Sequence, residues 1–277
     1  MTDDFEPHRQ FLIGVAYRML GSFAEAEDIV QDAFLRWSAT DRSTVDHPRT
    51  FLAKIVSRLC LDRMKSATTR RELYVGTWLP EPMVVTEIEP SADDISVALL
   101  LTLERLSPLE RAAFLLHDVF DMDYSAIAET LGRSEAACRK LAARAREHVR
   151  EERPRFSASE EGRAKLTDAF VAAAAAGDFE LIAQFLADDA VLYQDGGGKR
   201  PAAKHPIRGK DKIIQFFTAV KKSASPLEHV ERACINGLPG FVVRTSAGIE
   251  TISFEIADDR IIAIYSIRNP DKLRHLS

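Results

Sequence analysis

The chain has 277 residues, of which 46% are hydrophobic and 29% charged, and its formal net charge at pH 7 is −5. This length suits two or three domains, and the composition is that of an ordinary core-forming protein. The negative net charge excludes a uniformly basic nucleic-acid coat, so any contact with DNA has to come from local basic patches.

The cysteines and the N-terminus limit the class of protein further. Cys60, Cys138 and Cys234 are odd in number and far apart, which argues against a disulfide framework or a metal site. The first residues, MTDDFEPHRQ, lack the apolar core of a secretion signal, and no apolar run approaches the length of a membrane span. We therefore expect a cytoplasmic protein with no membrane segment, no metal and no cofactor.

The first block, residues 5–71, shows successive amphipathic helical patterns. Ser22, followed three residues later by Glu25, forms a capping box at the start of a helix with an acidic outer face. The helix that begins at Pro48 has an apolar side and a basic side, with seven basic residues against one acidic residue over 49–71. By themselves these patterns predict a helical bundle with solvated charged faces.

Residues 72–90 contain Pro80, Pro82 and Pro90 and show no helical period, so we expect an extended connector. A tryptophan in such a segment is unusual, because an indole ring is normally buried against a partner surface. Trp78 therefore either contacts another part of the protein or belongs to a linker that merely lies on one domain.

A second helical block follows, with a helix over 93–106 and another that opens with the capping box Ser107–Glu110 and ends at Phe120. Residues 123–150 then read as a helix-turn-helix, with Gly132 in the turn and Ser134 as the cap of the second helix. The outer face of that second helix is small and mostly basic, as insertion into a major groove requires. An ordinary helical hairpin with a solvated face is the alternative.

In the last part of the chain, the pattern predicts helices over 163–176, 179–186 and 209–222, a strand within 187–199 that ends in a glycine turn, and alternating strands from residue 229 onward. Helices followed by a curved antiparallel sheet describe an α+β cone. Two further strings, DGGGK at 195–199 and NPDKL at 269–273, stand out. The first does not fit a phosphate-binding loop, because the spacing of its glycines is wrong and Lys199 is followed by arginine.

Several strings together resemble a known family. AEDIVQDAFLRW, HPRTFLAKIVSRLCLDRMKS and SPLERAAFLLHDVF resemble the extracytoplasmic-function sigma factors of the sigma-70 family. TWLPEP, DGGGK and NPDKL resemble the signature strings of the SigJ-like subgroup, which carries a C-terminal SnoaL-like domain. The resemblance implies two all-α domains followed by an α+β cone: region 2 at 1–71, a linker at 72–92, region 4 at 93–153 and the SnoaL-like domain at 154–277.

The resemblance also implies an alternative sigma factor that binds core RNA polymerase, through its β′ coiled coil and β flap, and promoter DNA at −35 and −10. It assigns core binding to Asp28, Gln31, Asp32 and Trp37. It assigns −10 contacts to Lys54, Arg58 and Arg63, and −35 contacts to Arg139, Lys140, Ala143, Arg144 and Arg146. It assigns regulatory interdomain contacts to Trp78, Leu79, Pro80, Asp195, Gly196, Gly197, Gly198, Lys199, Asn269, Pro270, Asp271, Lys272 and Leu273.

Regulation in cis by the C-terminal domain is expected, so the sequence requires no separate anti-sigma factor. Two other classes remain open: a ligand-sensing helix-turn-helix regulator that works without polymerase, and an enzyme of the SnoaL-like kind. A small molecule could fill the cone, with Tyr193, Asp195, His205 and Glu250 as polar candidates near its mouth. We expect no catalysis, because the best-placed acid, Asp195, lies beside a glycine turn.

Overall fold

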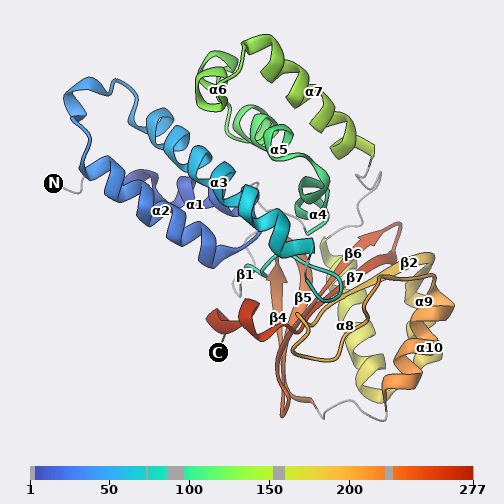
Figure 1. Cartoon of the computed structure of the whole chain (residues 1–277). Coiled ribbons are helices and arrows are strands. Elements are labelled where there is room, and N and C mark those ends of the chain that lie inside the picture. Colours follow the sequence, from blue (N-terminus) through green and yellow to red (C-terminus); the bar gives the residue numbers. More distant parts are fainter. Residues whose placement is uncertain (1–3, 73, 86–96, 152–159, 222–226, 277) are drawn as a thin grey trace. The chain divides into compact units, whose positions relative to one another are not determined.

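The structure, a computed structural model, describes residues 4–72, 74–85, 97–151, 160–221 and 227–276 (Figure 1). The chain forms two compact units, and each is described here by itself. Unit 1 contains Met1–Leu73 and Leu99–Arg153, and unit 2 contains Tyr74–Ala98 and Pro154–Ser277. Residues 74–85 of the connector thus pack with the C-terminal part of the chain.

The N-terminal half of unit 1 is a helical bundle. Its elements are η1 (Glu6–His8), α1 (Arg9–Leu20), α2 (Phe23–Ser38), η2 (Arg42–Thr44) and α3 (Pro48–Glu72). Gly21, at φ 69°, ends α1 in the left-handed conformation, and the Ser22 hydroxyl then caps α2 by accepting from the Glu25 N–H at 3.3 Å. The predicted start of the third helix at Pro48 is confirmed.

The second half of unit 1 comprises α4 (Val97–Arg105), α5 (Pro108–Phe114), η3 (Leu115–Val119), α6 (Tyr124–Leu131) and α7 (Glu135–Glu151). The capping box at Ser107 and Glu110 is confirmed, and Ser134 caps α7 through the Ala137 N–H at 3.2 Å. The helix predicted to run to Phe120 instead widens into a π-helical turn at η3. There the Phe120 N–H reaches the Leu115 carbonyl at 3.0 Å, before the chain reverses.

Unit 2 is a seven-stranded sheet in the order β1-β4-β5-β6-β7-β2-β3, and α8, α9 and α10 cover one face of it (Figure 1). The helices are α8 (Glu160–Ala176), α9 (Phe179–Phe185) and α10 (Lys210–Val220), followed near the C-terminus by η5 (Pro270–Lys272) and η6 (Arg274–Leu276). The strands are β1 (Val84–Val85), β2 (Leu186–Asp195), β3 (Ile207–Arg208), β4 (Leu227–Ile235), β5 (Leu238–Thr245), β6 (Gly248–Ala257) and β7 (Arg260–Ile267). Neighbouring strands are antiparallel except for the pair β2 and β7.

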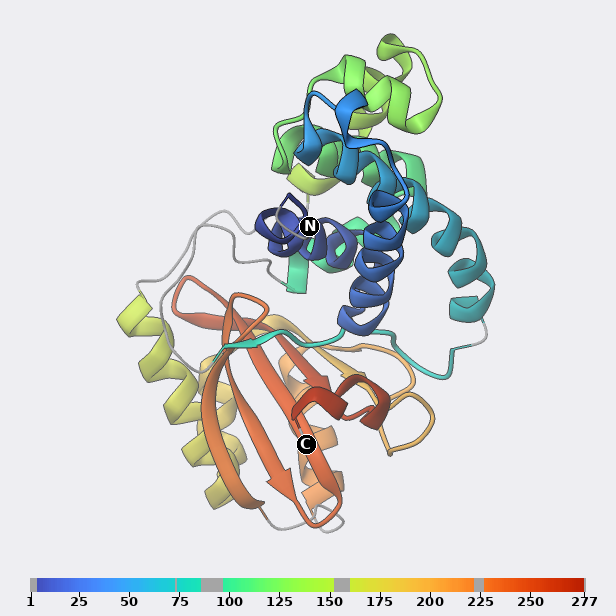
Figure 2. The same cartoon turned by 90° about the vertical axis from the view of Figure 1, so that its left-hand side faces the viewer.

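Alternation along the strands divides their side chains between the two faces of the sheet. Leu192, Phe254 and Ile264 belong to the core that the sheet forms with its helices. Tyr193 and Tyr265, on the other face, stack with their ring centroids 5.3 Å apart. Connector residues lie across this second face, as Figure 2 shows.

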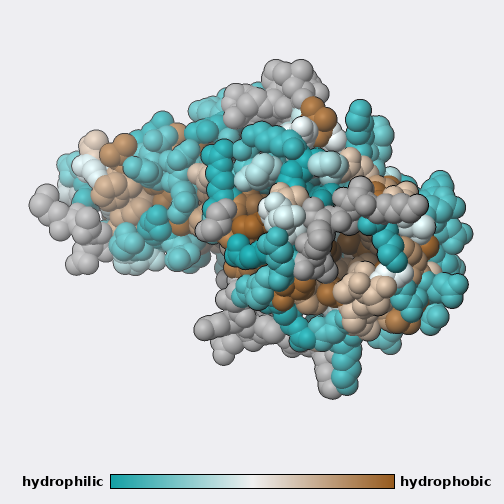
Figure 3. Space-filling model, turned by 90° about the horizontal axis from the view of Figure 1, so that it is seen from below, coloured by the Kyte–Doolittle hydropathy of each residue, from teal (hydrophilic) through white to brown (hydrophobic). Residues whose placement is uncertain are grey.

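Hydrophilic side chains cover much of the surface seen from below, with smaller apolar groups between them (Figure 3). Within the described part of the chain, no helix has the length and apolarity needed to cross a bilayer.

Candidate functional site

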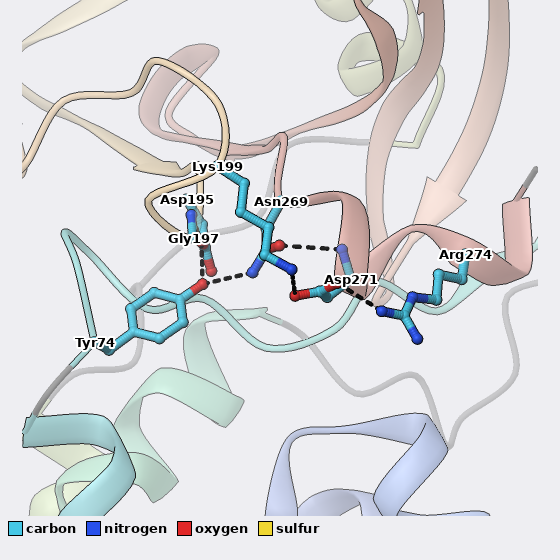
Figure 4. Close-up of polar contacts among 7 residues, drawn as sticks. All are labelled: Tyr74, Asp195, Gly197, Lys199, Asn269, Asp271 and Arg274. Carbon is cyan, nitrogen blue, oxygen red and sulfur yellow. Dashed lines mark hydrogen bonds and ion pairs between the residues drawn. The ribbon is translucent and has the colours of Figure 1, made fainter.

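The centre of the site in unit 2 is Asp195, the last residue of β2, whose side chain is completely buried. Its carboxylate accepts hydrogen bonds from the Tyr74 hydroxyl at 2.5 Å and the Gly197 N–H at 3.0 Å (Figure 4). It also accepts from the Leu79 N–H at 2.9 Å and forms an ion pair with Lys272 Nζ at 2.7 Å. A buried carboxylate is costly unless it is paired and hydrogen-bonded, and this one is both.

The glycines of the DGGGK string are required by the tight turn after Asp195. A Cβ on Gly196 would lie 2.2 Å from the Arg200 carbonyl oxygen, and a Cβ on Gly197 would lie 2.3 Å from the Asn269 side chain. Gly197 and Gly198 also have φ values of 60° and 70°, which favour glycine. The turn therefore brings the backbone close to the NPDKL string, which no larger residue would allow.

Asn269 joins the NPDKL string to the connector. Its side-chain NH2 donates to the Tyr74 hydroxyl at 2.8 Å, and its side-chain oxygen accepts from the Asp271 N–H at 3.1 Å (Figure 4). Asp271 in turn pairs with Lys199 at 2.5 Å and Arg274 at 2.7 Å. The hydrogen bond from Lys199, followed by that from Arg274, lowers the pKa of the Asp271 carboxyl.

Trp78, for which the sequence left open a contact with another part of the protein, lies against the ammonium group of Lys272. This ammonium lies 4.2 Å from the centroid of the Trp78 ring and 5.1 Å from that of the Tyr74 ring, and it donates to the Leu79 carbonyl. Leu79 and Pro80 are buried, so TWLPEP is a packed segment of the protein. Burial and the hydrogen bond to Asp195 raise the pKa of Tyr74.

We call residues 74–85 the strap, because they cross the open face of the sheet (Figure 2). One end contacts Asp195 on β2, and the other pairs with β4 through Val84 and Val85. Met83 exchanges hydrogen bonds with Asn236, and His275 donates to the Pro82 carbonyl at 2.9 Å. Since β7, β6 and β5 lie between β2 and β4, the strap spans most of the sheet's width.

The polar candidates for a ligand or catalytic site do not converge. Glu250 accepts from the Ser266 hydroxyl at 2.8 Å and pairs with Arg268 at 3.1 Å, whereas His205 is exposed. Tyr193 faces Tyr265, and Asp195 is occupied by the strap. Among the described residues, no group of three or more metal-ligating side chains comes together.

Sequence reasoning missed a buried acid on the open face. Glu255 of β6 accepts a hydrogen bond from the Tyr265 hydroxyl at 2.6 Å, and burial raises its pKa. The alternation along β6 places it on the face opposite Phe254, which is the signal that could have found it.

In unit 1 the exposed face of α2 carries Asp28, Gln31 and Asp32, as expected. The expectation that Trp37 contacts polymerase is wrong, because its side chain is 1% exposed and packs against Phe51 at a centroid distance of 5.8 Å. Leu35, which sequence reasoning missed, is 61% exposed on the same helix.

The basic residues assigned to the −10 element all have partners inside unit 1. Lys54 forms an ion pair with Glu129, and Arg58 donates to the carbonyls of Glu129 and Thr130. Arg63 lies 3.6 Å from the Glu25 carboxylate. These side chains are therefore not free in this conformation.

On α7, four of the residues assigned to the −35 element are exposed: Arg139, Lys140, Ala143 and Arg144. The fifth, Arg146, is partly exposed and donates to the Asp118 carboxylate at 2.6 Å and to the Tyr124 hydroxyl at 2.8 Å, so its contact with the −35 element stays a prediction. The hydrogen bond from Arg146 to Asp118 raises the pKa of the guanidinium and ties α7 to the preceding helices.

Comparison with known proteins shows which family combines a helical unit of this kind with a C-terminal sheet in one chain. Residues 5–70 match the family Sigma-70 region 2, and residues 96–149 match the family Sigma-70, region 4. The chain is 38% identical to the ECF RNA polymerase sigma factor SigJ of Mycobacterium tuberculosis, over 98% of this chain and 92% of that protein. The chain belongs to the ECF sigma factors. It is also 34% identical to the probable ECF sigma factor SigI of the same species, over 96% of this chain and 92% of that protein.

The whole fold of this sigma factor is shared with a relative of known structure. The crystal structure of M. tuberculosis SigJ matches with a TM-score of 0.77 at 35% identity, covering 99% of this chain and 98% of that chain. The predicted class, helical regions 2 and 4 followed by a C-terminal α+β domain, is thereby confirmed. Its relatives are sigma factors, which are not enzymes, and this protein is likewise an alternative sigma factor and not an enzyme. A regulator that works without polymerase would have no use for region 2.

Proposed function

We propose that this sigma factor binds core RNA polymerase through α2, contacts the −10 and −35 elements through α3 and α7, and is regulated by its C-terminal domain through the strap. One observation supports the regulatory part most directly. The segment that joins the two DNA-binding regions is bound by a fully buried carboxylate of the third domain, Asp195. Binding of the strap to the sheet, or its release, therefore changes how regions 2 and 4 can move.

The division into domains at 1–71, 72–92, 93–153 and 154–277 stays a prediction, with one refinement. Since the strap packs on the sheet through Asp195 and Asn236, part of the linker belongs structurally to the C-terminal domain. We propose no small-molecule ligand, because apolar side chains such as Phe170, Ile213 and Phe254 occupy the space between the sheet and its helices.

The proposed polymerase-binding surface combines charge with an apolar centre. Asp28, Gln31 and Asp32 supply polar contacts, and Leu35 adds the exposed apolar side chain that interface centres usually contain. We propose the β′ coiled coil as the partner of this surface and the β flap as the partner of region 4.

Replacing Asp28 and Asp32 together by alanine is expected to weaken binding to purified core polymerase at least about 30-fold, because a single hot-spot contact already costs about 2 kcal/mol or more. The measurement is a titration of labelled sigma factor with core enzyme, followed by transcription from a promoter identified by genome-wide binding. Glu228→Ala, an exposed acid on β4, is the control and should bind as the wild type does. Unchanged core binding by the double variant would contradict the proposed role of α2.

At the −35 element, Lys140→Ala is expected to weaken promoter binding by the polymerase holoenzyme by roughly 1–3 kcal/mol at one base pair and to relax the preference there. Arg146→Ala should instead lower the stability of unit 1, since its partners are Asp118 and Tyr124. Binding measured on a set of single-base promoter variants separates these effects. If Lys140→Ala weakened binding equally for all single-base promoter variants, Lys140 would contact the phosphate backbone and not a base.

A further inference from the structure

We infer that regions 2 and 4 of the free sigma factor inhibit each other directly: α6 of region 4 occupies the basic side chains of α3 that the −10 element needs. This goes beyond regulation by the C-terminal domain, because both partners lie within unit 1. It rests on the proposed −10 role of Lys54 and Arg58. Opening this contact would then be a condition for promoter melting.

The polar part of the contact is formed by the end of one helix and the side of another. Arg58 Nη2 donates to the Glu129 carbonyl at 2.8 Å, and Arg58 Nε donates to the Thr130 carbonyl at 3.1 Å. Both carbonyls lie in the last turn of α6, where helix carbonyls lack intrahelical partners and attract cations. Lys54 adds an ion pair to the Glu129 side chain.

A small residue allows the two helices to come close. Ala53, one position before Lys54, is fully buried in a cluster whose other buried members come from region 4: Leu116, Met122, Ile127 and Cys138. Phe11 of α1 adds an edge-on contact with Phe120 at a centroid distance of 5.1 Å. The contact therefore combines apolar burial with ion pairing, which favours one relative position of α3 and α6.

A pocket of about 270 Å³, partly open to solvent, lies beside this contact. It is lined by residues of both regions, including Phe11, Arg49, Phe120 and Asp123. The contact between the two regions is therefore bordered on this side by solvent-accessible space.

Single-stranded DNA and region 4 therefore compete for the same cations. A melted −10 strand needs Lys54 and Arg58 for its phosphates, and these side chains already have a carboxylate and two carbonyls as partners. Free sigma factor should bind single strands weakly. Core polymerase should hold the two regions apart and so free the Lys54 and Arg58 side chains for DNA.

The test uses the intact chain and a zero-length carbodiimide crosslinker, which joins an amine to a carboxylate only when the two are in contact. Mass spectrometry should detect a crosslink between Lys54 and Glu129 in the free protein, and this crosslink should disappear when core polymerase is added. Its absence in the free protein, or its persistence in a promoter complex that transcribes, would overturn the inference.

A second measurement does not depend on the crosslink. Glu129→Lys should tighten binding of the free protein to a fluorescein-labelled 20-nucleotide single strand about fivefold more than Glu6→Lys does. Glu6 is an exposed acid of unit 1, so its replacement changes the net charge equally and leaves α6 intact. Equal gains for the two variants would overturn the inference. Failure of the wild type to bind core polymerase would count instead against the proposed function.

Discussion

Asp195→Ala is expected to lower the free energy of unfolding of unit 2 by about 3–5 kcal/mol and to release the strap, because removing one partner of a buried ion pair leaves the other charge uncompensated. The Asp195 side chain is 0% exposed and that of Lys272 is 12% exposed. The same change removes the acceptor of the Tyr74 hydroxyl and of the Leu79 N–H. Urea unfolding of the intact chain gives the loss of stability.

Release of the strap has its own signal. The chain has 2 tryptophans, and Trp78 lies under Lys272 whereas Trp37 is buried in unit 1. Asp195→Ala should therefore shift part of the emission to longer wavelength and increase quenching by iodide.

Two variants control this experiment. Asp271→Ala removes a carboxylate that is 41% exposed and should cost less than about 1 kcal/mol. Asp195→Ala combined with Lys272→Met should recover only the part of the loss that comes from the uncompensated Lys272 charge, because the Tyr74 hydroxyl and the Leu79 N–H still lack their acceptor. Stability of the single Asp195 variant within 1 kcal/mol of the wild type would show that the ion pair does not hold the strap.

Arg111→Met is expected to lower the free energy of unfolding of unit 1 by about 3 kcal/mol or more. The Arg111 residue is 1% exposed, and its Nη1 donates to the Met19 carbonyl at 2.6 Å and to the Glu104 carboxylate at 2.8 Å. Burial lowers its pKa to about 10, so the guanidinium stays charged at neutral pH. Methionine fills a similar volume but removes the donor that reaches both acceptors.

This loss is best measured by urea unfolding followed by circular dichroism, since unit 1 contains the helices α1 to α3, most of α4, and α5 to α7. Arg105→Met, an exposed arginine on α4, is the matched control and should change stability by less than about 0.5 kcal/mol. Equal effects of the two substitutions would mean that the buried guanidinium does not join α5 to α1.

Much of the local structure follows from the sequence. The apolar period of α7, the capping box at Ser107 and the alternation along β6 each depend on residues a few positions apart. Family resemblance also indicated which strings matter, and Asp195 is now explained as the residue that binds the strap.

What the sequence did not reveal depends on distant partners. Tyr74 lies outside the TWLPEP string, and its acceptor is 121 positions away. Arg58 and its acceptor carbonyl on Glu129 are 71 positions apart, so no local pattern could show that a proposed DNA contact is occupied. Trp37 is a different case, because the helical period already placed it on the buried stripe and the assignment by resemblance disregarded that.

The strap also sets the length of the tether between the two DNA-binding regions. With the strap bound, residues 86–96 join it to α4, and an 11-residue segment can extend no more than about 40 Å from Val85. With the strap detached, residues 73–96 connect α3 to α4, and the same limit rises to about 80 Å. The C-terminal domain thus sets the anchor point of region 4: with the strap detached, 24 residues instead of 11 separate α4 from the structural element that precedes it.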